Sequence, residues 1–263
     1  MPTRVINGAR IHYEEAGSGP ETLVFSHGLL MNGDMFSDQV KSLSARYRCI
    51  SYDHRGQGRS EVTESGYDMD SLAADAAALI SELGAAPCHF AGLSMGGFVG
   101  MRLAIHHPEL LRSLILMDTS ADPEPEHNRG PYRRLAFVGR WFGFRPVVKP
   151  VMKIMFGKTF LTDPAKKASR ENWKNHLVGL DRIGTSRAAH GVIDRDGVYD
   201  QLDRIRTPTL VLVGDEDVAT VPAKAERLHA AIRDSKYVVI PGAGHSASIE
   251  QPALVTRAIE DFL

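Results

Sequence analysis

The chain has 263 residues, of which 43% are hydrophobic and 24% are charged, and its formal net charge is −1. This composition is ordinary for a globular domain, and a net charge so near zero provides no basic field for nucleic acid. No apolar run approaches the roughly 20 residues of a membrane span, and the N-terminal residues lack the apolar core of a signal peptide. We therefore expect a cytoplasmic protein with no nucleic-acid and no membrane partner.

Short apolar runs bounded by turn residues predict buried strands along most of the chain. Residues 4–16 alternate around an Asn7-Gly8 dipeptide, which predicts a β-hairpin. The buried runs that follow are 22–26, 48–52, one that begins at Cys88, 111–117, 208–213 and 236–240. The two cysteines, Cys49 and Cys88, lie in such runs and are expected to be reduced core residues rather than a disulfide or a metal pair.

Helical patterns separate these runs. They cover residues 35–45, 70–83, the segment after Ser94, 222–232 and 251–263, and Asp34 is a candidate cap for the first. Strands that alternate with helices predict an α/β protein with a mostly parallel sheet covered by helices on both faces.

The alternation stops near residue 120 and resumes near residue 206. The residues between carry helical spacing but no clean strand, and they are too many for a structureless loop. We therefore predict a core made of residues 1–120 and 206–263, with a helical cap inserted at 121–205. The cap holds both tryptophans and an arginine cluster that either favours an anionic substrate or forms a solvated face; its members are Arg129, Arg133, Arg134, Arg140 and Arg145.

A Gly-x-Ser-x-Gly pentapeptide joins the strand at Cys88 to the next helix, and Ser94 is its serine. A serine on a sharp strand-to-helix turn has its hydroxyl exposed in front of a helix N-terminus, which is the nucleophile-elbow arrangement. The tight turn favours glycine at positions 92 and 96 because a Cβ there would collide with the neighbouring backbone. Taken alone, the five residues are equally compatible with an ordinary Gly/Ser-rich turn.

The chain offers a base and an acid in the order Ser, Asp, His that such an elbow requires. His245 follows Gly242-Ala243-Gly244 after the last predicted strand and is the best candidate for the base. For the acid we favour Asp217, because Asp215 directly follows a glycine and is better placed to cap the turn. Asp118, at the end of an earlier strand, is the remaining alternative.

Acyl transfer also needs two backbone N–H donors for the oxyanion. Met95, the residue after the serine, is one candidate, and Leu29, in the loop that follows His27-Gly28, is the other. The histidines and cysteines show no ligand spacing, so we expect neither a metal nor an organic cofactor.

These motifs together resemble the α/β-hydrolase fold superfamily over nearly the whole length outside the insertion. The stretches that carry the resemblance are His27-Gly28-Leu29, the run from Asp53 to Ser60, Gly92 to Gly97, Gly214 to Asp217, and Gly242 to His245. The resemblance implies a mostly parallel eight-stranded sheet with a helical cap after the sixth strand. It also supports Asp217, because similar proteins carry the acid three residues after the corresponding glycine.

Within that superfamily the chain is most similar to the serine-nucleophile branch of 3-oxoadipate enol-lactonases, small carboxylesterases and cofactor-free haloperoxidase-like esterases. The resemblance implies a serine hydrolase that cleaves a small carboxylic ester or lactone through an acyl-enzyme intermediate. Two alternatives use the same triad: a C–C bond hydrolase of meta-cleavage products, and a slow-hydrolysing ligand receptor. We expect a small-molecule partner and a pocket lined by Leu30, Trp141, Trp173 and His190, and the sequence carries no signal for the oligomeric state.

Overall fold

A computed structural model describes residues 2–263 of the protein. Within these residues one eight-stranded sheet has the order β1-β2-β4-β3-β5-β6-β7-β8. Strand β2 pairs in antiparallel fashion with β1 and β4, and every other pair is parallel, which confirms the predicted mostly parallel sheet. The strands are β1 (Thr3–Ile6), β2 (Ala9–Ala16), β3 (Thr22–Ser26), β4 (Arg48–Tyr52), β5 (Cys88–Leu93), β6 (Leu111–Met117), β7 (Thr209–Gly214) and β8 (Lys236–Ile240).

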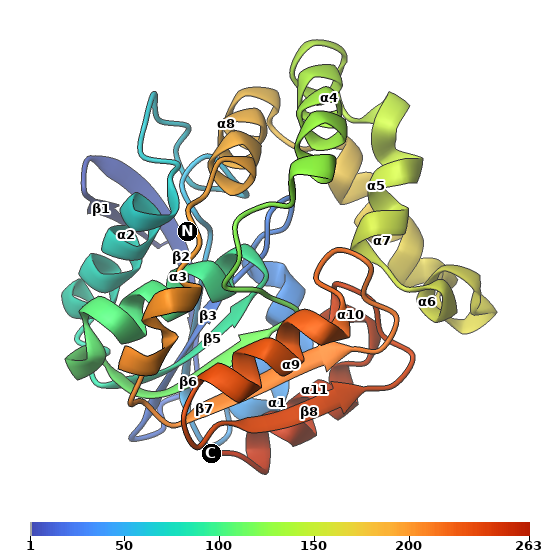
Figure 1. Ribbon diagram of the computed structural model, residues 1–263. Coiled ribbons are helices and arrows are strands. Elements are labelled where there is room, and N and C mark those ends of the chain that lie inside the picture. Colours follow the sequence, from blue (N-terminus) through green and yellow to red (C-terminus); the bar gives the residue numbers. More distant parts are fainter. Residues whose placement is uncertain (1) are drawn as a thin grey trace.

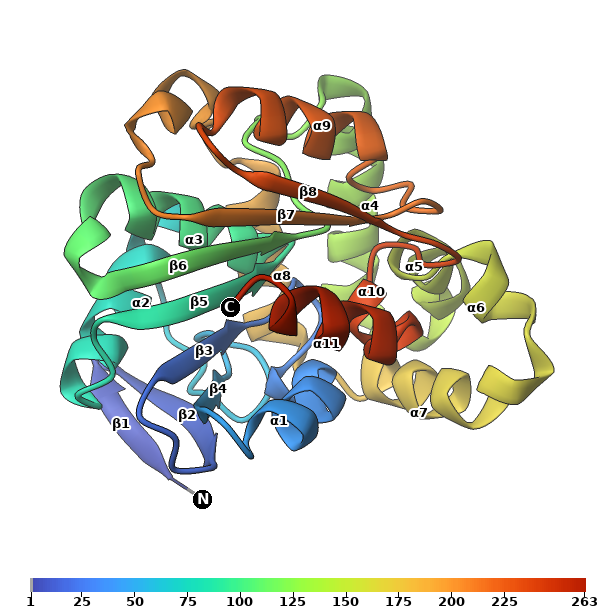
Figure 2. The same ribbon diagram turned by 90° about the horizontal axis from the view of Figure 1, so that it is seen from below.

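Helices cover both faces of the sheet (Figures 1 and 2). One face packs against α2, α3 and α9, and the other packs against α1 and α11. Because both faces are covered, strands β3, β5 and β7 are buried along their whole length. The core helices are α1 (Ser37–Leu43), α2 (Met69–Glu82), α3 (Met95–His106), α9 (Pro222–Ala231), α10 (Ala247–Glu250) and α11 (Pro252–Glu260).

One predicted helix begins differently from the expectation. A 3₁₀ turn at Gly33–Phe36 precedes α1, and Asp34 does not cap that helix because it lies within this turn and Phe36 takes the cap position; its carboxylate accepts from Arg59 at 3.0 Å. The predicted C-terminal helix is present as α11, and a further short helix, α10, precedes it and ends before Pro252, which has no N–H to continue it. Further 3₁₀ turns lie at Pro108–Leu110, Arg145–Val147, Pro164–Lys166 and Tyr199–Arg204.

The chain between β6 and β7 forms the predicted helical insertion, which lies beyond one edge of the sheet (Figure 1). Its middle part packs on the core through Phe156, Phe160 and Trp173, which share one buried cluster with Ala243 and Ile249. No helix within residues 2–263 is long and apolar enough to cross a membrane. The insertion contains α4 (Glu126–Phe142), α5 (Val148–Met155), α6 (Lys158–Thr162), α7 (Lys167–Val178) and α8 (Arg182–Ile193).

The strand register decides which loops meet beneath this cap. Ser26 pairs with Gly92, Leu93 pairs with Met117, and Gly214 pairs with Ile240. The carboxyl ends of the parallel strands are therefore level, and open α/β sheets bind ligands at such an edge.

Candidate active site

Ser94 occupies a strained turn between β5 and α3. Its φ of 53° lies in the left-handed region that side chains other than glycine rarely adopt. The backbone is held from both sides, because Ser94 N–H donates to the Met117 carbonyl at 2.9 Å and the Thr119 hydroxyl donates to the Ser94 carbonyl at 2.8 Å. The surrounding fold thus fixes the serine in a conformation that the isolated chain would avoid.

The glycines of the elbow have the steric role that the sequence predicts. A Cβ on Gly92 would lie 2.2 Å from the Gly96 carbonyl oxygen, and one on Gly96 would lie 2.0 Å from the Ser26 carbonyl oxygen. Both collisions are with backbone atoms, which cannot swing aside as a side chain can. The helix can therefore approach β3 and β5 only with glycine at these two positions.

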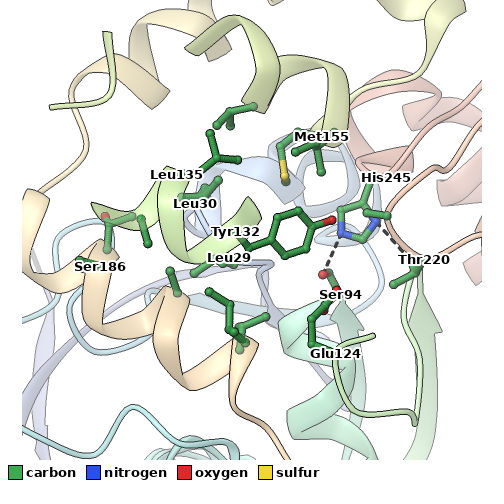
Figure 3. Close-up of a pocket in the computed structure, with 18 of the residues that line it drawn as sticks. Leu29, Leu30, Ser94, Glu124, Tyr132, Leu135, Met155, Ser186, Thr220 and His245 are labelled. Carbon is green, nitrogen blue, oxygen red and sulfur yellow. Dashed lines mark hydrogen bonds between the residues drawn. The ribbon is translucent and has the colours of Figure 1, made fainter. Parts of the chain in front are cut away.

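The structure brings the three residues of the predicted triad into hydrogen-bonding distance. Ser94 Oγ lies 2.8 Å from His245 Nε2, and His245 Nδ1 lies 2.9 Å from Asp217 Oδ2 (Figure 3 shows the first contact). The Asp217 carboxylate can only accept, so Nδ1 carries the proton and Nε2 is free to accept from the serine hydroxyl. This is the tautomer in which His245 can remove the Ser94 proton.

Asp217 is held by the turn that follows β7. Its Oδ1 accepts the N–H groups of Ala219 and Thr220 at 2.8 and 2.9 Å, and its Oδ2 also accepts the Thr220 hydroxyl at 2.7 Å. The carboxylate therefore has one oxygen fixed by backbone and the other directed at His245.

The two other candidate acids have different partners. Asp215 accepts the Gly242 N–H at 2.8 Å and so ties two loops together. Asp118 is fully buried and accepts the N–H groups of Gly214 and Ala247 at 2.8 and 3.1 Å, with no hydrogen bond to His245 among the described residues.

The pKa values separate Asp217 from Asp118. Burial, with the nearby charge of Asp217, raises the pKa of Asp118 to about 8, so Asp118 is largely protonated at neutral pH. Burial alone would also raise the pKa of Asp217, but the neighbouring His245 and the Thr220 hydrogen bonds lower it below the ordinary value. Burial alone would lower the pKa of His245, and the Asp217 carboxylate more than offsets this, so that it is raised. The ionised carboxylate is therefore the one that touches the histidine.

The loop that carries Leu29 is fixed on its N-terminal side by a buried histidine. His27 Nε2 accepts the His54 N–H at 2.9 Å, so Nδ1 carries the proton and donates to the Gly28 carbonyl at 2.7 Å. Burial lowers the pKa of His27, which keeps the ring neutral for both bonds.

The same loop is fixed on its C-terminal side from the core and from the cap. Leu30 has a φ of 69°, its N–H donates to Gln57 Oε1 at 3.0 Å, and its carbonyl lies 3.0 Å from His176 Nε2 on α7. The N–H groups of Leu29 and Met95 have no acceptor among residues 2–263. Two unengaged donors thus flank Ser94, one from a pinned loop and one from the first turn of α3.

A cavity of about 120 Å³ opens on Ser94 and His245 beneath the cap. Leu29 and Leu30 form part of its floor, and Tyr132 projects from α4 with its hydroxyl toward His245 (Figure 3). Apolar side chains make up most of the wall and come from α3, α4, α5, α8 and the turn after α4; they are Phe98, Leu135, Ala136, Phe144, Val151, Ile154, Met155, Ala189, Val192 and Ile193.

Polar groups interrupt this wall at a few places. Arg195 and Glu124 form a buried ion pair at 2.9 Å, and the Arg195 guanidinium lies 4.2 Å from the Phe98 ring centroid. Thr185 and Ser186 of α8 also line the cavity. Within residues 2–263 no group of His, Cys, Asp and Glu side chains is arranged to hold a metal ion.

Three residues predicted to line the pocket lie elsewhere, and that expectation is corrected. Trp141 is 60% exposed on the outer face of α4, because the helix turns Tyr132, Leu135 and Ala136 inward instead. Trp173 is buried where the cap packs on the core. His190 borders a separate, open groove on the outside of α8.

Some residues of the site carry no sequence signal strong enough to find them. Tyr132 and Gln57 lie far from Ser94 in the chain, and only the tertiary structure brings them to it. Thr220 had a usable signal, because a hydroxyl three residues after an aspartate commonly bonds its carboxylate in a turn.

Comparisons with known proteins agree with the fold and the motifs described above. The sequence profile of the α/β hydrolase fold family matches residues 21–252. The chain belongs to the α/β hydrolase family. It is 30% identical over 238 residues to 3-oxoadipate enol-lactonase 2 of Acinetobacter baylyi, and the match covers 90% of this chain and 86% of that one. The family membership confirms the resemblance inferred from the motifs.

Two solved structures show how far the likeness extends in space. A thermophilic esterase from Thermogutta terrifontis superposes with a TM-score of 0.91 at 29% identity, and the match covers 99% of this chain and 96% of that chain. The enol-lactonase from Burkholderia xenovorans superposes with a TM-score of 0.92 at 27% identity, with 99% of each chain covered. The core and the cap are both included in these matches.

Proposed function

We propose that this α/β hydrolase is a serine hydrolase that cleaves a small carboxylic ester or lactone through an acyl-enzyme intermediate. The observation that carries the proposal is the 2.8 Å contact between Ser94 Oγ and His245 Nε2 at the floor of an apolar cavity. The named relatives, an enol-lactonase and an esterase, act on the same kind of carbonyl and support this class of substrate.

The proposed mechanism uses the groups already described. His245 accepts the Ser94 proton as Oγ attacks the substrate carbonyl, and the N–H groups of Leu29 and Met95 stabilise the resulting oxyanion. Asp217 holds the imidazole in the required tautomer and stabilises its positive charge. His245 then gives the proton to the leaving alcohol, and a water molecule activated by the same histidine hydrolyses the acyl-enzyme.

The cavity indicates the kind of acyl group that this site favours. Its wall is mostly apolar, and apart from His245 the charged groups among the described residues that line it, Glu124 and Arg195, neutralise each other. A neutral acyl group is therefore favoured over an anionic one, because an added charge would be desolvated without a free partner.

The test is hydrolysis of a panel of p-nitrophenyl esters and lactones by the parent protein and by Ser94→Ala. We expect turnover by the parent and a loss of at least about 10³-fold in the variant. Undiminished turnover by Ser94→Ala would contradict the nucleophile assignment.

The same panel separates the two alternatives that share the triad. A dienoic diketone cleaved faster than any ester would favour the C–C hydrolase. Turnover far below about one per second on every substrate would favour the receptor, since this is below the usual range of enzymes.

A further inference from the structure

Three aromatic side chains of the cap are exposed, and they neither line the cavity nor pack in the core. Phe137, Trp141 and Phe142 of α4 are 57%, 60% and 66% exposed, and the ring centroids of the first two lie 6.5 Å apart. Scattered exposed hydrophobic residues are normal, but a cluster of large ones on one helix marks a surface that contacts something. The fold itself leaves this cluster without a partner among residues 2–263.

The same part of the cap is strongly basic. From His127 to Thr162 the chain has no acidic residue, whereas its net charge over all 263 residues is −1. Only Arg129 and Arg133 of the basic residues in this segment have a carboxylate within 4.0 Å among residues 2–263. The basic residues of the segment are Arg129, Arg133, Arg134, Arg140, Arg145, Lys149, Lys153 and Lys158.

Helical geometry brings three of these groups onto one face. Arg134, Phe137 and Trp141 are spaced by three and four residues, which places them side by side along α4. The Arg140 guanidinium lies over the Trp141 ring, 5.2 Å from its centroid. We call Arg134, Phe137, Arg140, Trp141 and Phe142 the α4 outer surface; α4 stands at the end of the molecule farthest from the sheet (Figure 1).

We propose that the α4 outer surface binds the protein peripherally to an anionic lipid surface, which revises the expectation of no membrane partner. Exposed aromatic rings insert at the boundary between headgroups and acyl chains, and basic side chains beside them attract anionic headgroups. The arginine stems can extend along the apolar boundary while the guanidinium groups stay among the headgroups.

The charge pattern favours a lipid surface over a second copy of this chain. In a twofold-symmetric dimer the same patch contacts itself, so Arg134 and Arg140 would face a like set of arginines. An anionic surface instead neutralises them. The inner side of α4 lines the cavity with Tyr132, Leu135 and Ala136, so binding would set the cap against the lipid surface without occupying the cavity. The inference does not depend on what the cavity hydrolyses.

The chain offers a fluorescent reporter at the proposed contact. It has two tryptophans, of which Trp141 is 60% exposed and Trp173 is 7% exposed. The protein is mixed with vesicles of phosphatidylcholine alone, or of equal parts phosphatidylcholine and phosphatidylglycerol. We expect co-sedimentation and a blue shift of tryptophan emission with the anionic vesicles only. Both should disappear at about 0.5 M salt, where charges are screened over a few ångströms.

Variants locate the contact and provide a matched control. Trp141→Phe should keep co-sedimentation and lose the blue shift, since the remaining tryptophan is buried. Arg134→Gln with Phe137→Ser should reduce the partition coefficient by at least about fivefold, the contribution of one basic residue near such a surface. The control is Arg257→Gln with Leu254→Ser on α11, which removes the same charge and an exposed apolar group outside the cap and should leave binding unchanged.

Several outcomes would overturn the proposal. These are equal binding to both kinds of vesicle, binding to neither, a blue shift that persists in Trp141→Phe, or an equal loss in the α11 control. Concentration-dependent dimerisation that the α4 variant abolishes, without vesicle binding, would assign the surface to a second copy instead. Hydrolysis of a soluble short-chain ester should be the same in both double variants, which shows that they are folded.

Discussion

Replacing Asp217 by asparagine tests the geometry around His245 most directly. The Asp217 carboxylate accepts three donors from the turn in addition to His245 Nδ1–H. Asparagine has one acceptor oxygen, which the N–H groups of Ala219 and Thr220 hold, so its NH₂ group faces the imidazole. The ring then changes tautomer, with the proton on Nε2 facing Ser94, and cannot act as the base. The matching substitution in the Ser-His-Asp template costs about 10⁴-fold in kcat, and we expect a loss of that order here.

The pH profile gives an independent readout of the same substitution. Because His245 must be neutral to act as a base, kcat/KM rises with pH through its pKa. The Asp217 carboxylate holds that pKa above the ordinary value against the effect of burial. With the carboxylate removed, burial dominates, so the residual activity of Asp217→Asn should have its acid limb at lower pH than the parent. The measurement is kcat/KM for a p-nitrophenyl ester across pH 5 to 8, roughly the range in which histidines titrate.

Asp118→Asn is the matched comparison, because Asp118 is the other buried aspartate near His245. Burial raises its pKa to about 8, and its charge raises the pKa of His245 less than that of Asp217 does. We expect Asp118→Asn to lower stability by about 1 to 3 kcal/mol, since one of the N–H groups of Gly214 and Ala247 loses its acceptor. It should leave kcat/KM within a few-fold of the parent. If Asp118→Asn caused the large loss and Asp217→Asn a small one, the assignment of the acid would be reversed.

Two further substitutions test the oxyanion loop and the elbow. Gln57→Ala removes the acceptor of the Leu30 N–H, and we expect kcat to fall by up to about 10²-fold with KM little changed. The affinity for a boronic acid that mimics the tetrahedral intermediate should fall by a similar factor. A change in KM alone would contradict the positioning role of Gln57. Gly96→Ala should destabilise the fold by about 3 kcal/mol, the upper end for overpacking, because its Cβ meets the Ser26 carbonyl. Gly130→Ala in α4, where a Cβ meets nothing within 4 Å, should instead raise Tm slightly in thermal denaturation.

The loop that carries Leu29 makes hydrogen bonds to both the core and the cap. His27 and Gln57 hold it from the core side, and His176 holds the Leu30 carbonyl from α7. Burial lowers the pKa of His176, so its ring is neutral near pH 7 and Nε2–H can donate to that carbonyl. The position of the cap and the direction of the Leu29 N–H are therefore coupled through the backbone from Gly28 to Leu30.

The sequence by itself was sufficient to predict the sheet and the local geometry of the elbow. Parallel strands buried on both faces must be mostly apolar, and that leaves a recognisable pattern in β3, β5 and β7. The glycines beside Ser94 are likewise a local requirement, since a side chain there strikes backbone only a few residues away or on the adjacent strand.

Only the tertiary structure determined which cap residues face the cavity and which residues surround the triad. An amphipathic helix shows which side is apolar, but α4 has large apolar groups on both sides, so its sequence could not say whether Trp141 or Tyr132 faces the cavity. The contacts of Gln57, His176 and Tyr132 join segments far apart in the chain, and no local preference encodes them. Residues fixed by short-range sterics and by burial on a sheet can be predicted from the chain, whereas those fixed by how two packed layers meet cannot.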